Sequence, residues 1–189
     1  IYLPYWLLSY EALVSMFVDR SDQNAPNQAM IMAREINEAK KKYLEKNDLK
    51  DIADCFTIDS PVPFDLSLLV DRLKDINAEM VPSARAGSEK QGDFHGKLSR
   101  LISRLENKIS DRRLGFMFNG GGDLLKVGWL DEFSKYVMGS ANENCGKGVK
   151  IVDFSEVPSD ILPLVVSLIA RVAFSVQQWT PPNLRHPIA

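Results

Sequence analysis

The sequence has few of the residues that build metal centres or disulfide scaffolds. Its 189 residues include only two cysteines, Cys55 and Cys145, and two histidines, His95 and His186, all far apart along the chain. A zinc site or a disulfide framework needs such residues in clusters at defined spacings. The sequence therefore predicts no metal ligand, and we interpret both cysteines as reduced thiols of a cytoplasmic protein.

Catalytic motifs are also missing from the sequence. A phosphate-binding loop requires a glycine-rich turn followed by Lys and Ser or Thr. The only glycine cluster, 120–122, leads into Asp123 instead, which is typical of a flexible turn. No GxSxG nucleophile elbow occurs either. A small stand-alone enzyme is consequently the least favoured class of function.

Charge and hydropathy exclude two further classes. The formal net charge of −2 gives no global basic signal for nucleic acid, although a local basic patch remains compatible with it. Residues 1–8 are apolar but lack the basic start of a signal peptide. The most apolar run, 161–170, contains Pro163 and is too short to span a membrane. We expect it to be a buried helix and expect no membrane partner.

Apolar residues recur at spacings of three and four along most of the chain, which predicts amphipathic helices. Loops or turns are expected between them, with an exposed loop at 81–93 and a short strand at 113–118. Asp65 is placed to cap the third main helix. The expected helices are 8–19, 26–46, 66–80, 94–110 and 129–138, with a short helix or turn at 49–56.

The predicted buried faces follow from the same spacing. Glu35, Lys41 and Lys42 fall on the opposite, solvated face of the second helix. The predicted buried positions are Ala29, Met32, Ile36, Ala39 and Tyr43, then Leu66, Leu69, Leu73, Ile76 and Met80, and then Leu98, Leu101, Ile102, Leu105 and Ile109.

The pattern changes near residue 149. A β-rich run at 149–154 is followed by a turn and an apolar helix at about 159–178, which is half of a parallel α/β unit. A lone parallel strand needs neighbouring strands for its backbone groups. We therefore predict a mainly α fold with a minor α/β element. Residues 1–140 would form a helical insert domain and residues 141–189 a partial RecA-like α/β element.

Two sets of residues are candidates for a functional site. Lys97, Arg100, Arg104 and Lys108 form one stripe of the fourth main helix, which can face a DNA phosphate backbone or be a solvated face balanced by Glu106 and Asp111. Asp153 ends the predicted strand, where ligands gather in α/β sheets. It is a candidate core acid, and the alternative is a cap of the following turn.

Six segments, in order, resemble the HerA-like P-loop ATPases of the HerA/FtsK superfamily, which are hexameric DNA translocases. The most informative are the aromatic opening Leu3-Pro4-Tyr5-Trp6, the segment Asp22-Gln23-Asn24-Ala25-Pro26-Asn27-Gln28, and Asp111-Arg112-Arg113-Leu114-Gly115-Phe116. The six segments are 3–11, 22–28, 60–65, 98–118, 149–174 and 185–189.

The resemblance implies a helical segment of a DNA-translocating ATPase or helicase, between the Walker A and Walker B motifs. On that expectation the hydrolytic residues lie outside the chain, which is itself inactive, and ATP and Mg²⁺ bind the intact protein. DNA, other copies of the chain and a nuclease or effector would be partners. The candidates for the family's trans-acting arginine are Arg112 and Arg113, with Arg171 and Arg185 as further candidates. The alternative is a free-standing helical protein–protein interaction module.

Overall fold

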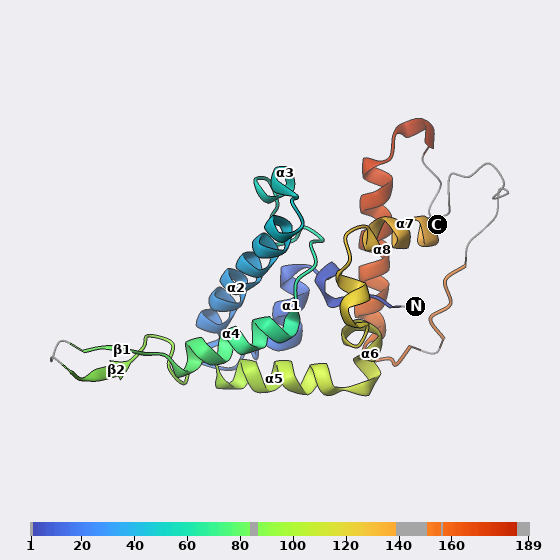
Figure 1. Cartoon of the computed structure of the whole chain (residues 1–189). Helices are drawn as coiled ribbons and strands as arrows, with labels where there is room; N and C mark the ends of the chain where they lie inside the picture. Colours follow the sequence, from blue (N-terminus) through green and yellow to red (C-terminus); the bar gives the residue numbers. More distant parts are fainter. Residues whose placement is uncertain (1, 84–86, 139–150, 156, 185–189) are drawn as a thin grey trace. The chain divides into compact units, whose positions relative to one another are not determined.

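The computed structural model describes residues 2–83, 87–138, 151–155 and 157–184, and the chain forms two compact units (Figure 1). Unit 1 is Ile1–Gly121 and unit 2 is Gly122–Ala189. Helices dominate, and the only sheet in the described residues has two strands, which confirms the mainly α fold class. The predicted boundary at residue 140 lies outside the described residues and stays a prediction.

Two helices of unit 1, α1 and α4, begin with a side-chain cap. The Ser9 hydroxyl accepts a hydrogen bond from the Ala12 amide at 3.2 Å, and the Asp65 carboxylate accepts one from the Ser67 amide at 2.8 Å. The predicted Asp65 cap is thus confirmed. The elements are η1 Tyr5–Leu7, α1 Tyr10–Phe17, α2 Ala25–Lys46, α3 Lys50–Ala53, α4 Leu66–Ala78, β1 Met80–Pro82, β2 Glu89–Gln91, α5 Ser99–Ser110, η2 Arg112–Leu114 and α6 Gly115–Phe118.

The core of unit 1 lies where α2, α4 and α5 pack against one another and against the first residues of the chain. Tyr5 packs edge-on against Phe64, with ring centroids 5.2 Å apart, and stacks with Phe118. Its buried hydroxyl donates to the Phe64 carbonyl and accepts from the Leu66 amide. Burial raises the pKa of Tyr5, so the phenol stays neutral and fixes the segment before α4.

The buried face of α2 differs from the predicted one. Met32 and Ile36 are buried as expected, but Ala29, Ala39 and Tyr43 are only half-buried. The remaining buried positions are Gln28, Ile31, Glu35, Lys40 and Leu44. The buried face is rotated relative to the predicted one because it includes three polar side chains. A pattern of apolar residues does not count such side chains as buried.

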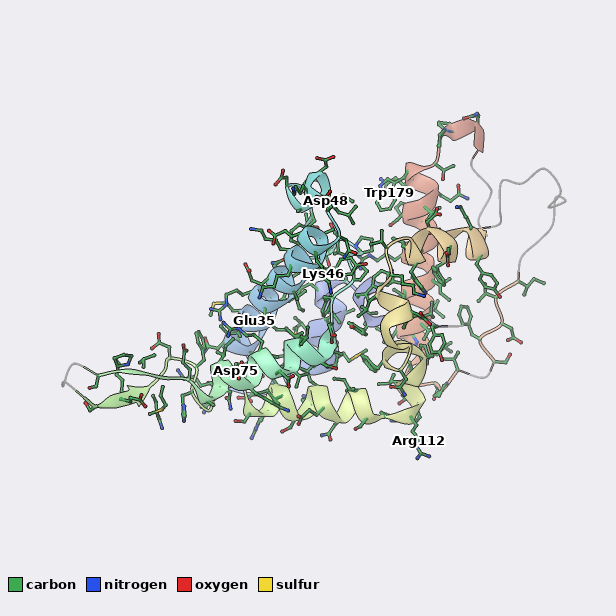
Figure 2. The ribbon with its side chains drawn as sticks, viewed as in Figure 1. Glu35, Lys46, Asp48, Asp75, Arg112 and Trp179 are labelled. Atoms are coloured by element: carbon green, nitrogen blue, oxygen red, sulfur yellow. The ribbon has the colours of Figure 1, made fainter. Side chains whose placement is uncertain are left out.

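Two of these buried polar groups tie α2 to other parts of unit 1. The Glu35 carboxylate, predicted to be solvated, lies 2.9 Å from Arg34 Nε and 3.4 Å from Arg72 Nε of α4 (Figure 2). The Lys40 ammonium donates to the carbonyls of Ile58 and Ser60 at 2.6 and 2.7 Å. Charged groups tolerate burial when they are paired or hydrogen-bonded, as both are here.

Two further segments of unit 1 depart from the prediction. The expected loop at 81–93 contains an antiparallel hairpin, with Val81 paired to Lys90, and Figure 1 shows it projecting away from the helices. Its base is closed by a hydrogen bond of 2.9 Å from the Gly92 amide to the Glu79 carbonyl. The expected strand at 113–118 is helical, because the Asp111 carboxylate accepts from the Arg113 amide and starts a helical turn.

The element η3 Gly121–Leu125 spans the boundary between the units, and unit 2 continues with α7 Trp129–Met138, α8 Leu162–Trp179 and η4 Pro182–Leu184. The helices α7 and α8 pack together. The expected helix 129–138 is confirmed. The expected helix at 159–178 starts at Leu162, with Pro163 in its first turn. Residues 151–154 of the expected strand 149–154 form no strand, because none of the described residues lies beside them as a ladder partner.

The long helix α8 buries only part of its apolar surface. Val165, Leu168, Val172 and Ala173 are buried, whereas Phe174 and Trp179 are 66% and 69% exposed. By length and composition α8 is the one described helix that could cross a membrane, a test that core helices of soluble proteins also pass. The expectation of a buried helix at the run 161–170 is therefore wrong, because the described residues cover only part of the apolar surface of α8.

Candidate nucleic-acid interface

The basic stripe belongs to α5, which is fixed in unit 1 by its apolar face. Leu98, Leu101 and Leu105 are completely buried, as their spacing predicts. The start of the helix is held by Asn77 of α4, whose side-chain oxygen accepts from the Leu98 amide at 2.8 Å. With one face buried and the first turn tied down, the opposite face is held outward.

The structure brings the four predicted cations onto this outward face. Lys97 precedes α5, and the others follow at spacings of three, four and four, so they lie along one side of the helix. The Arg100 and Arg104 side chains are 70% and 42% exposed. We call these four residues, Lys97, Arg100, Arg104 and Lys108, the basic face of α5.

The anions nearest to these cations are mostly not the ones the sequence suggested, although Lys108 contributes to lowering the pKa of Asp111. Glu106 pairs with Lys74 of α4 at 2.7 Å, and Asp111 pairs with Arg113 at 2.8 Å. The loop between α1 and α2 supplies the partners instead. Asp19 lies 3.4 Å from Arg104, and Asp22 lies 3.8 Å from Arg100. Among the described residues, Lys97 and Lys108 form no ion pair within 4 Å.

Both loop carboxylates have lowered pKa values. Hydrogen bonds from the Ser21 hydroxyl and amide lower the pKa of Asp19, with smaller contributions from Arg104 and Arg100. The Asn24 amide lowers the pKa of Asp22, followed by the Gln28 side chain and Arg100. Both acids are therefore ionised at neutral pH and reduce the positive charge of the basic face.

A buried amide connects this loop to α5. The Gln28 side-chain nitrogen donates to the Asp22 carboxylate and to the Lys97 carbonyl, each at 3.1 Å. Its side-chain oxygen is buried without a hydrogen-bond partner in the described part of the chain. Sequence reasoning missed Gln28, although it stands one turn before Met32 and Ile31 on the buried face.

The remaining candidates are Arg112 and Arg113 of unit 1 and Asp153 of unit 2. Arg112 projects from the end of α5 into solvent (Figure 2), while the Arg113 guanidinium folds back onto Asp111. Asp153 of unit 2 is exposed, and its carboxylate accepts from the Ser155 amide at 2.8 Å. Hydrogen bonds from the Ser155 hydroxyl and amide lower the pKa of Asp153. This is the geometry of a turn cap.

The described residues do not fit a nucleotide with its magnesium ion. Within them, no group of three or more His, Cys, Asp or Glu side chains could hold a metal ion. The glycine cluster at 120–122 leads into a 3₁₀ turn in which Asp123 pairs with Lys126 at 2.6 Å, so a carboxylate stands where a phosphate loop needs donors.

Comparison with known proteins places the chain in a family. No curated protein matches it. The family model described as "Helicase HerA, central domain" matches residues 1–173, which is most of the chain. This confirms the relationship to HerA-like P-loop ATPases that the ordered segments indicated. The chain belongs to the HerA central-domain family.

Proposed function

We propose that this chain is the central helical segment of a HerA-like DNA-translocating ATPase, and that the basic face of α5 contacts DNA phosphates. The observation that carries the proposal is the row of four solvent-accessible cations along α5 and the residue just before it, in a chain of this family. Arg100 and Arg104 each make one long ion pair, in which the guanidinium keeps contact with solvent although Asp22 itself is buried. Such pairs are worth about 0–1 kcal/mol, so phosphates can displace them.

The test is salt-dependent duplex binding by the full chain and by the double variant Arg100→Glu/Arg104→Glu. Each phosphate contact contributes about 0.9 to the slope of log K against log salt concentration. The double variant is expected to lose about two units of slope. The control is Lys41→Glu/Lys42→Glu, which makes the same charge change on the exposed side of α2. If the double variant has the same DNA affinity and salt slope as this control, the basic face of α5 does not contact DNA.

ATP and Mg²⁺ belong, in this proposal, to the intact protein, and the chain itself lacks hydrolytic residues. The support is the missing phosphate-loop motif and the poor fit of the described residues to a nucleotide site. Purified chain should show only background ATP turnover, and turnover that persists through stringent repurification would contradict this. A GxxxxGK[ST] motif encoded upstream and an apolar run ending in Asp-Glu downstream would support the placement.

The remaining parts of the proposal concern assembly. We place the intact protein in the cytoplasm as a hexameric ring on DNA, with a nuclease or effector as a further partner and no membrane contact. Arg112 is exposed and Arg113 is held by Asp111, so Arg112 is the better of the two for reaching a neighbouring subunit. Loss of DNA-stimulated turnover in the intact protein on Arg112→Ala, with unchanged ring assembly, would support this role.

A second candidate is a free-standing helical protein–protein interaction module. The observation that favours it is the exposed apolar surface of α8, which includes Val166, Phe174 and Trp179. A native gene that encodes only these residues, together with salt-independent DNA affinity, would favour the module over the motor segment.

A further inference from the structure

The loop between α1 and α2, residues 18–24, carries the carboxylates that face the basic face of α5, and we call it the acidic loop. Asp19 reaches Arg104 and Asp22 reaches Arg100, at 3.4 and 3.8 Å. Charge-assisted hydrogen bonds between a guanidinium and a carboxylate are about 2.7–2.9 Å long. Both contacts are therefore loose, and each guanidinium keeps donors that these acids do not use.

The acidic loop is nevertheless held in place. The Asp19 carboxylate accepts from the Ser21 amide at 3.0 Å and from the Ser21 hydroxyl at 2.7 Å. Asp22 accepts from the Asn24 amide at 2.9 Å and from the buried side chain of Gln28. Gln28 also bonds the Lys97 carbonyl, so the acids and the start of α5 share one network. The carboxylates are thus fixed by their own loop and by Gln28 of α2, in addition to their contacts with the arginines.

We propose that Asp19 and Asp22 are specificity-determining residues, which act as built-in competitors of phosphate for Arg104 and Arg100. The inference rests on the proposed contact of α5 with DNA. A carboxylate and a phosphate are alternative partners of the same guanidinium donors. A single phosphate ion gains little by displacing a carboxylate that is already in place. A phosphodiester backbone offers several phosphates at once and also reaches Lys97 and Lys108. The acidic loop therefore selects a polyanion over small phosphate compounds.

The test is Asp19→Asn in the full chain. Asparagine keeps the side-chain oxygen that accepts from Ser21 and removes the charge beside Arg104, so the turn is preserved. Removing one exposed competitor should tighten duplex binding by about two- to fivefold at low salt. The control is Asp51→Asn on α3, which follows the far end of α2, a helix about 33 Å long at 1.5 Å per residue. Thermal unfolding of both variants checks that the fold is unchanged.

A double-mutant cycle shows whether the gain acts through the arginine. In an Arg104→Gln background, Asp19→Asn should tighten binding no more than Asp51→Asn does. If Arg104→Gln weakens binding but Asp19→Asn merely equals the control in both backgrounds, the competitor role is wrong and the proposed DNA contact survives. If the wild-type chain shows no salt-dependent binding, the DNA contact fails and this inference fails with it.

Discussion

The helix α5 of unit 1 and the helix α8 of unit 2 differ in how completely their apolar side chains are buried. In α5, twelve residues divide cleanly into a buried apolar stripe and a charged outward face. In α8, eighteen residues carry one charged side chain, Arg171, and leave Phe174 and Trp179 largely exposed. The described residues of unit 1 cover the apolar side of α5, whereas those of unit 2 leave much of α8 uncovered.

This difference predicts that the two units differ in stability. Unit 1 buries aromatic, aliphatic and paired polar groups in one core. Unit 2 has a smaller core around Phe133, Val165 and Leu168. Apolar burial contributes about 25 cal/mol per Å², so the larger core should give unit 1 the higher stability. The predictions below test that contrast, from the largest expected effect to the smallest.

The largest effect is expected for Leu105→Ala in the core of unit 1. Leu105 is fully buried, and truncation at such sites costs about 2–5 kcal/mol of unfolding free energy. Replacing Trp129 and Trp179 by phenylalanine leaves Trp6, which is buried in unit 1, as the only tryptophan, and selective excitation of tryptophan reports on it. Its urea transition should shift strongly for Leu105→Ala and hardly at all for Leu168→Ala in unit 2. Equal shifts would mean that the two units unfold as one.

The second prediction concerns the buried ammonium of unit 1. Lys40→Met should lower the stability of unit 1 by about 2 kcal/mol, because the carbonyls of Ile58 and Ser60 lose their donor. Lys41→Met, one residue away on the exposed side, should change it by less than about 0.5 kcal/mol. The Trp6 urea transition measures both. Similar changes in stability at the two positions would show that the hydrogen bonds of the Lys40 ammonium do not stabilise unit 1.

Periodicity predicted most of the helices but not the buried polar groups. The spacing of leucines located α4 and α5 and most of their buried faces, since apolar burial decides both. Met80, predicted to be buried, instead lies in β1 and is 46% exposed, and Ile109 is only half-buried. Lys40 stands one turn from both Ile36 and Leu44, yet a pattern of apolar residues does not count a lysine among the buried positions. Its burial depends on carbonyls some twenty residues away, which no local pattern contains.

The sequence predicted the cations of the candidate site but not the carboxylates that pair with them. The cations of α5 follow from the helical period, but their partners Asp19 and Asp22 come from a loop far away in sequence. The nearer acids Glu106 and Asp111 were the obvious local choice and are engaged with Lys74 and Arg113. Similarly, the β-rich run at 151–154 depends on a neighbouring strand that the described residues do not supply.

The third prediction addresses the exposed face of α8. Phe174→Ser should leave the stability of unit 2 nearly unchanged, because the ring is already largely exposed. It should reduce self-association, which sedimentation velocity over a range of concentrations measures. Val165→Ser, at a buried position of the same helix, should instead destabilise unit 2 by about 1–3 kcal/mol. If Phe174→Ser associates as strongly as the wild type, the exposed face of α8 does not mediate self-association.

The smallest effect is a pH dependence of unit 1 from Asp19, Asp22 and Asp111. Their pKa values are lowered in the folded chain, so each contributes stability above the ordinary value of 3.8 that is lost as the pH falls through the folded value. Acid unfolding followed by Trp6 between about pH 5 and pH 2 should therefore be shallower for Asp19→Asn than for wild type. An identical profile would contradict the contribution of Asp19.

The contact of α5 with DNA is tested most directly by lysine footprinting of the full chain with and without duplex DNA. Limited acetylation and mass spectrometry compare Lys97 and Lys108 on the basic face with Lys41 and Lys42 on α2. We predict that DNA protects Lys97 and Lys108 and leaves Lys41 and Lys42 reactive, with the protection lost at high salt. Protection of Lys41 and Lys42 alone, or equal protection of all four, would contradict the account.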